Sequence, residues 1–213
     1  MKLEGAIFDF DGTLLDSMGV WDTLGSDFLR LRGIAAKPGL DRALAPLTLP
    51  QAAEYLKGNY PLDEPPEALV RQINELLAGY YRDTLKAKEG APALLKRMEA
   101  HGVRMCLATA TDRPLVEAAL KRLKLNRYFS GLVTCAEAGA GKDRPDIYRT
   151  ALSRLKTKRS RTVVFEDALH AVRSARTAGF RVAAVYDESA APDSGEIRRL
   201  ADWYLNNIND WKF

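Results

Sequence analysis

Two aspartates, Asp9 and Asp11, lie two positions apart in the segment FDFDGTLLD, and a glycine turn and Thr13 follow them. One carboxylate of such a pair can attack an electrophilic atom while its neighbour donates a proton to the leaving group. If residue 9 ends a strand and residue 11 begins a turn, strand alternation no longer sends the two side chains to opposite faces. The pair therefore fits a carboxylate nucleophile beside a general acid. Attack on phosphorus would form an acyl phosphate and divide a slow hydrolysis into two steps.

Two further carboxylates, Glu166 and Asp167, follow the apolar segment Thr162 to Phe165. Two like charges about 4 Å apart repel by about 4 kcal/mol at an effective dielectric constant of about 20. Carboxylates gathered at one place must therefore be neutralised by protons or by a cation. Oxygen ligands without nearby histidine or cysteine favour Mg²⁺ over zinc or copper. The sequence thus predicts a Mg²⁺ site among Asp9, Asp11, Glu166 and Asp167.

Thr109, Ala110 and Lys142 are candidates for binding an anion beside these carboxylates. Thr109 ends an expected strand just before a helix start, where its hydroxyl and the amide of Ala110 can face an anion. Lys142 precedes the helix that Pro145 marks, and from there it can reach a phosphoryl oxygen. Taken alone, an ordinary turn threonine and a solvated lysine are the simpler interpretations. Their order along the chain relative to the four carboxylates favours phosphate binding.

A parallel sheet is needed to bring these residues together. Leu3 to Phe10 is a short apolar strand that ends in a turn signal. After residue 90 the patterns alternate, with strands expected over 103–110, 132–135, 162–165, 181–186 and 203–205 and helices over 93–100, 114–123, 145–155 and 168–178. Strict alternation predicts a parallel sheet covered by helices on both faces. Ligands bind such sheets at the carboxyl ends of the strands, where the candidate residues fall.

A helical insertion separates the first strand from the rest of the sheet. Apolar residues recur at three- and four-residue steps from Val20 to Leu31 and from Leu69 to Tyr81, and no strand pattern interrupts residues 18–86. Prolines break this region into several helices: Pro38, Pro46, Pro50, Pro61, Pro65 and Pro66. We therefore expect an α/β protein with two parts. A doubly wound, Rossmann-like core comprises residues 1–14 and 87–213, and a mobile helical cap comprises residues 15–86.

The order of these motifs resembles the haloacid dehalogenase (HAD) superfamily over nearly the whole chain. Within it, the chain is similar to phosphatases and phosphomutases of the β-phosphoglucomutase type, whose helical cap is inserted after the first motif. Four segments carry the resemblance in order: Asp9-Phe-Asp11-Gly-Thr13, Thr109, Lys142 and Glu166-Asp167. The dehalogenase branch lacks an acid at the place of Asp11 and needs no metal. The presence of Asp11 therefore favours phosphoryl transfer over carbon–halogen cleavage.

The resemblance implies a role for each matched residue. Asp9 is implied as the nucleophile, and Asp11 as the acid and then the base. Mg²⁺ is implied to be held by Asp9, the main-chain carbonyl of Asp11 and Asp167, with Glu166 in support. The transferring phosphoryl group is implied to be bound by Thr109, the amide of Ala110 and Lys142.

The insertion bears on the choice between phosphatase and mutase. β-Phosphoglucomutases place a histidine twelve residues past the nucleophile and an arginine in a cap loop, whereas this chain has Trp21 there and no arginine in LAPLTLPQAAEYL. We therefore expect Mg²⁺-dependent hydrolysis of a small phosphate monoester, a sugar phosphate or a nucleotide-like metabolite. A phosphomutase is the alternative, and a non-catalytic module that binds phosphorylated metabolites is the second alternative. Ser17 and Trp21 are candidate contacts to the leaving group, although a core position is the simpler interpretation of Trp21.

Composition sets the remaining expectations. The 213 residues are 46% hydrophobic and 28% charged, which allows a sizeable core and suits one domain that carries an insertion. The net charge of +4 is spread among interspersed acids, so we expect no nucleic-acid partner. Glu4 and Asp9 interrupt any N-terminal signal sequence, and no run approaches the ~18 apolar residues of a membrane span. A cytoplasmic monomer or weak dimer is expected, with Cys106 and Cys135 as buried thiols rather than a disulfide.

Overall fold

The structure is a computed structural model that describes residues 2–44, 47 and 49–213. The chain forms two compact units. The core unit comprises Met1–Asp16 and Leu85–Phe213, and the helical unit comprises Ser17–Thr84. Because the chain leaves the core unit after residue 16 and returns at residue 85, the helical unit is an insertion.

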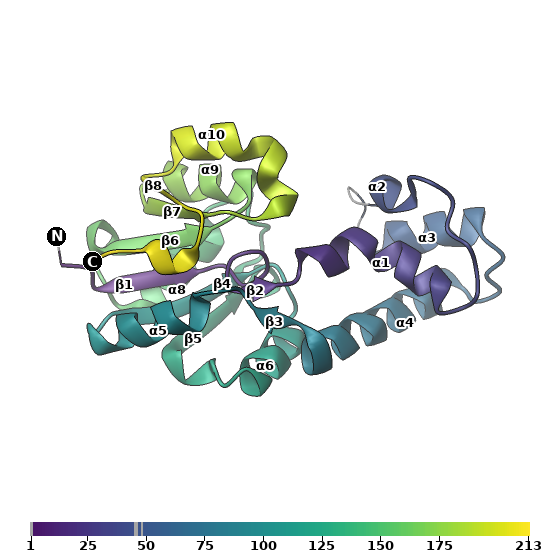
Figure 1. Ribbon diagram of the computed structural model, residues 1–213, viewed down its shortest axis with the longest axis horizontal. Coiled ribbons are helices and arrows are strands. Elements are labelled where there is room, and N and C mark those ends of the chain that lie inside the picture. The colour runs from purple at the N-terminus through teal and green to yellow at the C-terminus, as the bar shows by residue number, and fades with distance from the viewer. Residues whose placement is uncertain (1, 45–46, 48) are drawn as a thin grey trace. The chain divides into compact units, whose positions relative to one another are not determined.

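The core unit is built on a six-stranded parallel sheet with the strand order β5-β4-β1-β6-β7-β8 (Figure 1). Its strands are β1 (Gly5–Phe8), β4 (Arg104–Thr109), β5 (Phe129–Thr134), β6 (Thr162–Glu166), β7 (Arg181–Val185) and β8 (Trp203–Leu205). All four residues of the central strand β1 are buried, as expected for a strand covered on both faces. A short antiparallel pair, β2 (Leu15–Asp16) and β3 (Lys86–Ala87), lies where the chain leaves and re-enters the unit.

Helices cover both faces of this sheet. They are α5 (Ala91–Ala100), α6 (Arg113–Arg122), α7 (Cys135–Ala138), α8 (Asp146–Leu155), α9 (Leu169–Thr177) and α10 (Ser194–Leu200), with 3₁₀ turns η2 (Asn126–Tyr128), η3 (Arg159–Arg161), η4 (Glu188–Asp193) and η5 (Ile208–Asp210). Residues of α8 and α9 share one buried apolar cluster with Ile7 of β1, Cys106 of β4 and Val164 of β6. Figure 1 shows α5 and α6 on the opposite side of the strands from α9 and α10. The sheet is thus doubly wound.

The helical unit contains α1 (Met18–Arg30), α2 (Leu40–Leu44), α3 (Leu49–Asn59), α4 (Pro66–Gly79) and a π-helical turn η1 (Tyr80–Thr84). The apolar positions that recur every three or four residues are its buried ones, including Leu24 and Phe28 of α1 and Leu69, Ile73 and Leu77 of α4. Throughout the described ranges, no helix combines the length and the apolar character needed to cross a membrane.

The predicted fold class, a doubly wound parallel sheet with an inserted helical segment, is confirmed. Several element boundaries differ from the prediction. β1 covers residues 5–8 rather than 3–10, because the carbonyl of Phe10 accepts the amides of Leu14 and Leu15 and so belongs to a turn. β5 ends at Thr134 rather than at Cys135, because the Thr134 side chain accepts the Glu137 amide and caps α7.

Three expectations for other residues were wrong. Pro50 does not break a helix but lies in the first turn of α3, where a missing amide hydrogen costs nothing. Lys86 lies in strand β3 rather than in a helix. Cys106 is a buried free thiol as expected, whereas the free thiol of Cys135 is only partly buried. Pro46, another expected break, lies outside the described residues.

Candidate active site

The register of the parallel strands places the acidic residues at one edge of the sheet. Phe8 at the end of β1 pairs with Leu107 of β4 and with Phe165 of β6. The ladder continues for one more bond, from the amide of Asp9 to the carbonyl of Phe165 at 2.9 Å. Asp9 is therefore level with Glu166, one position beyond Phe165. Because all these strands run in one direction, their carboxyl ends meet at this edge.

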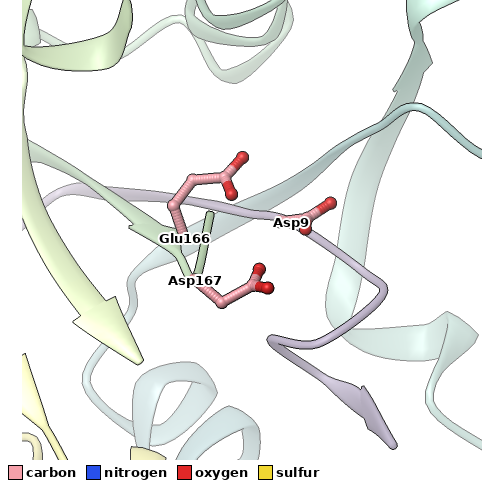
Figure 2. Close-up of side chains that lie close together, drawn as sticks. All are labelled: Asp9, Glu166 and Asp167. Carbon is pink, nitrogen blue, oxygen red and sulfur yellow. The ribbon is translucent and has the colours of Figure 1, made fainter. Parts of the chain in front are cut away.

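Three buried carboxylates converge there (Figure 2). Asp9, Glu166 and Asp167 each offer an oxygen within 4.8 Å of the others, and the three residues are 6%, 0% and 3% exposed. Burial and then the charge of Glu166 raise the pKa of Asp9 from 3.8 to about 6, against the opposing effect of Lys142. Burial, with the charge of Asp9, also raises the pKa of Asp167 well above its ordinary value. This cluster therefore favours the uptake of protons or of a cation.

Lys142 supplies one positive charge to this cluster. Its side chain is 6% exposed, and its ammonium forms an ion pair with Oδ1 of Asp9 and donates a 2.8 Å hydrogen bond to Oε1 of Glu166. Burial lowers the pKa of this ammonium, but the charges of Asp9 and Glu166 outweigh burial and raise it above the ordinary lysine value. Lys142 is therefore a charged group in contact with the predicted nucleophile. A single ammonium leaves part of the negative charge of three carboxylates uncompensated.

Glu166 shows that the donor set fits a bound cation. Its Oε1 accepts hydrogen bonds from Lys142 and from the hydroxyl of Tyr148, each at 2.8 Å. Its Oε2 is buried and has no hydrogen-bond partner among the described residues. An unpaired buried acceptor is costly, and native structures rarely leave one without a water or an ion. Because the atoms that could bind a cation here are all carboxylate oxygens, they suit a hard divalent cation.

Asp11 is not one of the three grouped carboxylates, and its side chain bonds to Thr111. The Thr111 hydroxyl donates a 2.6 Å hydrogen bond to Oδ2 of Asp11, and the Thr111 amide donates a 3.0 Å bond to Oγ1 of Thr109. Thr109 is fully buried, whereas Ala110 is exposed in the turn that follows β4. Thr111 thereby connects one predicted phosphate-binding residue, Thr109, with the predicted acid, through its amide and its hydroxyl respectively. Thr111 was missed in the sequence analysis, although a second threonine two positions after a strand end was a usable signal.

The turn after β1 packs directly against Asp167. Gly12 has a positive φ of 76°, and a Cβ atom at this position would lie 2.4 Å from Oδ2 of Asp167. Thr13 is fully buried, and its hydroxyl donates a 3.0 Å hydrogen bond to Oδ1 of Asp167. Glycine is therefore required at position 12 both for its backbone conformation and for space. We call residues 9–15 the first-motif turn.

Ser17 and Trp21 belong to the helical unit. Ser17 is fully buried at the N-terminus of α1, and its side chain makes no capping bond. Trp21 is half-buried and its indole Nε1 donates a 3.2 Å hydrogen bond to the hydroxyl of Tyr81. Trp21 is thus neither a fully buried core residue nor a freely exposed ring, and its contact with a leaving group stays a prediction.

Comparison with known proteins identifies the family. The sequence profile described as haloacid dehalogenase-like hydrolase matches residues 6–185, so the chain belongs to that family. The phosphorylated carbohydrates phosphatase of Thermotoga maritima is 25% identical over 97% of this chain and 98% of its own length. The fructose-1-phosphate phosphatase YqaB of Escherichia coli is 30% identical over 84% of this chain and 94% of its own length. A crystal structure of a HAD hydrolase, family IA, variant 3 from Entamoeba histolytica has the same fold, with a TM-score of 0.81 and 22% identity, covering 99% of this chain and 96% of that one.

Proposed function

We propose that the protein is a Mg²⁺-dependent phosphatase that hydrolyses small phosphate monoesters through an aspartyl phosphate on Asp9. The observation that carries this proposal is the contact of the buried Asp9 carboxylate with Lys142 beside two further buried carboxylates. A nucleophile, a fixed positive charge and a set of oxygen donors are what attack on a phosphate dianion requires. Membership of a hydrolase family supports the same reaction class.

Two proton transfers by Asp11 accompany the two proposed steps. In the first, Oδ of Asp9 attacks phosphorus while the bond to the leaving oxygen breaks, and Asp11 gives that oxygen its proton. In the second step, a water attacks the phosphorus of the aspartyl phosphate and gives a proton to Asp11. This attack breaks the bond between Asp9 and phosphorus, so that inorganic phosphate is released and Asp9 is restored. Thr109, the amide of Ala110 and Lys142 would bind the phosphoryl oxygens during both steps. Ala110 is an exposed residue, which is compatible with this role.

The proposed Mg²⁺ ion would be held by Asp9, Asp167 and the main-chain carbonyl of Asp11, with Glu166 in support. When bound, it would supply positive charge that offsets the repulsion between the carboxylate nucleophile and the phosphate. The unpaired Oε2 of Glu166 and the raised pKa values of Asp9 and Asp167 support a cation at this place. Both features reflect an excess of buried negative charge.

A sugar phosphate or a nucleotide-like metabolite is the proposed substrate class. Two relatives are named for phosphorylated carbohydrates and for fructose 1-phosphate, which supports a sugar phosphate first. Ser17 and Trp21 would contact the leaving group, and the residues 15–86 predicted as a cap would screen it from water. We further propose that the protein acts in the cytoplasm and is a monomer or weak dimer. Light scattering on the purified protein measures the oligomeric state.

A panel of phosphorylated metabolites tests the proposal. Phosphate release from sugar phosphates and nucleoside monophosphates is measured with Mg²⁺ and with a chelator, and Asp9→Asn is the matched control. We expect release from the wild-type protein with Mg²⁺ only, and a phosphoryl adduct by intact mass that Asp9→Asn lacks. Equal, negligible rates for both proteins would instead support a binding module. Isomerisation of the substrate without phosphate release, followed by NMR, would support a mutase.

A further inference from the structure

Lys88 lies in the core unit between β3 and α5, three positions after the chain returns to that unit at residue 85. Its side chain is 17% exposed. The ammonium donates three hydrogen bonds: to the carbonyl of Gly12 at 2.6 Å, to the carbonyl of Tyr186 at 2.7 Å and to Oδ2 of Asp187 at 2.7 Å. An ammonium has three protons, so these bonds use its whole donor capacity.

Asp187 and the carbonyl of Tyr186 together anchor this ammonium to the loop after β7. The Asp187 side chain is 8% exposed, and its Oδ1 accepts the amide of Ser189 at 3.0 Å and the Ser189 hydroxyl at 2.7 Å. Although burial raises the pKa of Asp187, the bonds from Lys88 and Ser189 hold it below the ordinary value. The carboxylate therefore stays charged on the loop after β7. Lys88 is thus anchored to a part of the core unit that carries none of the predicted catalytic residues.

The other end of the Lys88 contact lies in the first-motif turn. The backbone of Gly12 passes close to Asp167, and the next residue, Thr13, donates its hydroxyl to the same carboxylate. The backbone amide of Lys88 also donates a 2.9 Å bond to the carbonyl of Leu14. Gly12 therefore has Asp167 beside its Cα and the Lys88 ammonium at its carbonyl. A shift of this carbonyl would carry both Asp11 and Thr13 with it.

We propose that Lys88 is a positioning residue that holds the first-motif turn through the Gly12 carbonyl and so sets the geometry of Asp11 and Asp167. The assignment rests on the proposed function in so far as that function gives the turn its chemical role. An ordinary surface ion pair contributes little to stability. Lys88 differs from such a pair because two of its three bonds satisfy backbone carbonyls from separate loops, which lose their donor when the side chain is removed.

Lys88→Met tests the proposal, and Lys86→Met is the matched control. Lys86 is an exposed lysine two positions earlier, on β3. The first readout is hydrogen exchange of the turn amides in the absence of substrate, at Gly12, Leu14 and Leu15. The second is the separation of kcat from KM. We expect Lys88→Met to accelerate exchange in the turn and to lower kcat by roughly 10- to 100-fold, as a misplacement of about 1 Å can, with a smaller change in KM. Lys86→Met should match the wild type in both readouts.

Two further variants separate positioning from the ion pair. Asp187→Asn leaves both carbonyl bonds of Lys88 possible, so we expect turn exchange and kcat close to wild type. Lys88→Met combined with Asp187→Asn removes the unpaired carboxylate but not the loss at Gly12, so the defect should persist. A wild-type result for Lys88→Met, or full recovery in the double variant, would overturn the proposal.

The test stays decisive in two unfavourable cases, which are misfolding of the variant and absence of phosphatase activity. If Lys88→Met fails to fold, Lys88→Arg decides: it keeps the charge and several donors, and we expect intermediate exchange and kcat. Wild-type exchange and kcat in Lys88→Arg would contradict the positioning role, because an arginine does not place its donors where the lysine does. If the wild-type protein hydrolyses no phosphate monoester, the proposed function fails, and the exchange experiment still tests the role of Lys88.

Discussion

The hydroxyl of Thr13 donates a 3.0 Å hydrogen bond to Oδ1 of Asp167, although 154 positions of the chain separate the two residues. Both residues are buried, and the glycine before Thr13 lies against the other oxygen of the same carboxylate. The turn after β1 is therefore packed and hydrogen-bonded against Asp167, the residue that follows β6. The position of Asp167 in the carboxylate cluster thus depends on the first-motif turn.

Replacing Gly12 by alanine should disrupt the packing of the first-motif turn against Asp167. The new Cβ would lie 2.4 Å from Oδ2 of Asp167, and the positive φ of 76° adds backbone strain of about 1 kcal/mol or more. We expect Gly12→Ala to lose most of its phosphatase activity and its response to Mg²⁺ in thermal unfolding. Gly102→Ala is the control, because Gly102 has a similar φ of 70° and nothing near its Cβ position. Equal losses of activity in the two variants would contradict the role given to the Asp167 contact.

Thr111 should matter for turnover because its hydroxyl orients Asp11. Thr111→Val keeps the shape of the side chain but removes the 2.6 Å hydrogen bond to Oδ2 of Asp11. Well-placed acid–base catalysis contributes ~100- to 10,000-fold, so partial misplacement of the acid should lower kcat by roughly tenfold. Thr111→Ser keeps the hydroxyl and should retain most of the rate. Steady-state kinetics on the best substrate would compare the two variants, and equal rates would show that the Thr111 hydroxyl does not contribute to turnover.

The acidic residues could be placed from the sequence because each follows an apolar segment of strand length. Asp9 follows β1 and Glu166 ends β6, and a parallel sheet brings such positions to one edge whatever the loops do. The helical insertion was also predictable, since the apolar positions of α1 and α4 recur at helical spacing. Both inferences use local patterns together with a general rule of sheet architecture.

The supporting hydrogen bonds could not be predicted in this way. Tyr148 falls on the apolar face of α8, where a sequence suggests an ordinary core residue, yet its hydroxyl reaches Glu166. Lys88 resembles a solvated lysine beside Lys86, yet its donors are all used inside the core unit. These partners depend on the register between strands and on loop paths that join distant segments. No local spacing encodes them, so a single sequence without coordinates does not reveal them.

Removing the Tyr148 hydroxyl should destabilise the protein without abolishing the site. In Tyr148→Phe, Oε1 of Glu166 keeps the bond from Lys142 but loses the one from the hydroxyl. A hydrogen bond to a charged group contributes about 1.5–3 kcal/mol, so the free energy of unfolding in urea should fall by that order. Tyr204→Phe, at a partly exposed position, should change it by no more than about 0.5 kcal/mol. Similar values for the two variants would show that the Glu166 contact carries no special weight.

The contribution of Asp9 to the stability of the metal-free protein should fall as the pH rises. The folded pKa of Asp9 is raised from 3.8 to about 6, so the folded state binds a proton more tightly than the unfolded state does. A group of this kind contributes stability that is complete below its unfolded pKa and is lost as the pH rises through its folded pKa. A shift of about two units corresponds to a loss on the order of 3 kcal/mol between about pH 4 and pH 7. The raised pKa of Asp167 acts in the same direction.

Thermal unfolding of the wild-type protein and of Asp9→Asn, each from pH 4.5 to pH 8 in the presence of a chelator, measures this effect. The difference between the two midpoints should shift in favour of Asp9→Asn as the pH passes about 6, because the asparagine cannot lose a proton. Excess Mg²⁺ should raise the wild-type midpoint more at pH 7.5 than at pH 5, since a cation binds the deprotonated carboxylates and competes with their protons. A difference between the two proteins that does not vary with pH, or a Mg²⁺ effect that is larger in acid, would contradict the assignment of these carboxylates to one shared cation site.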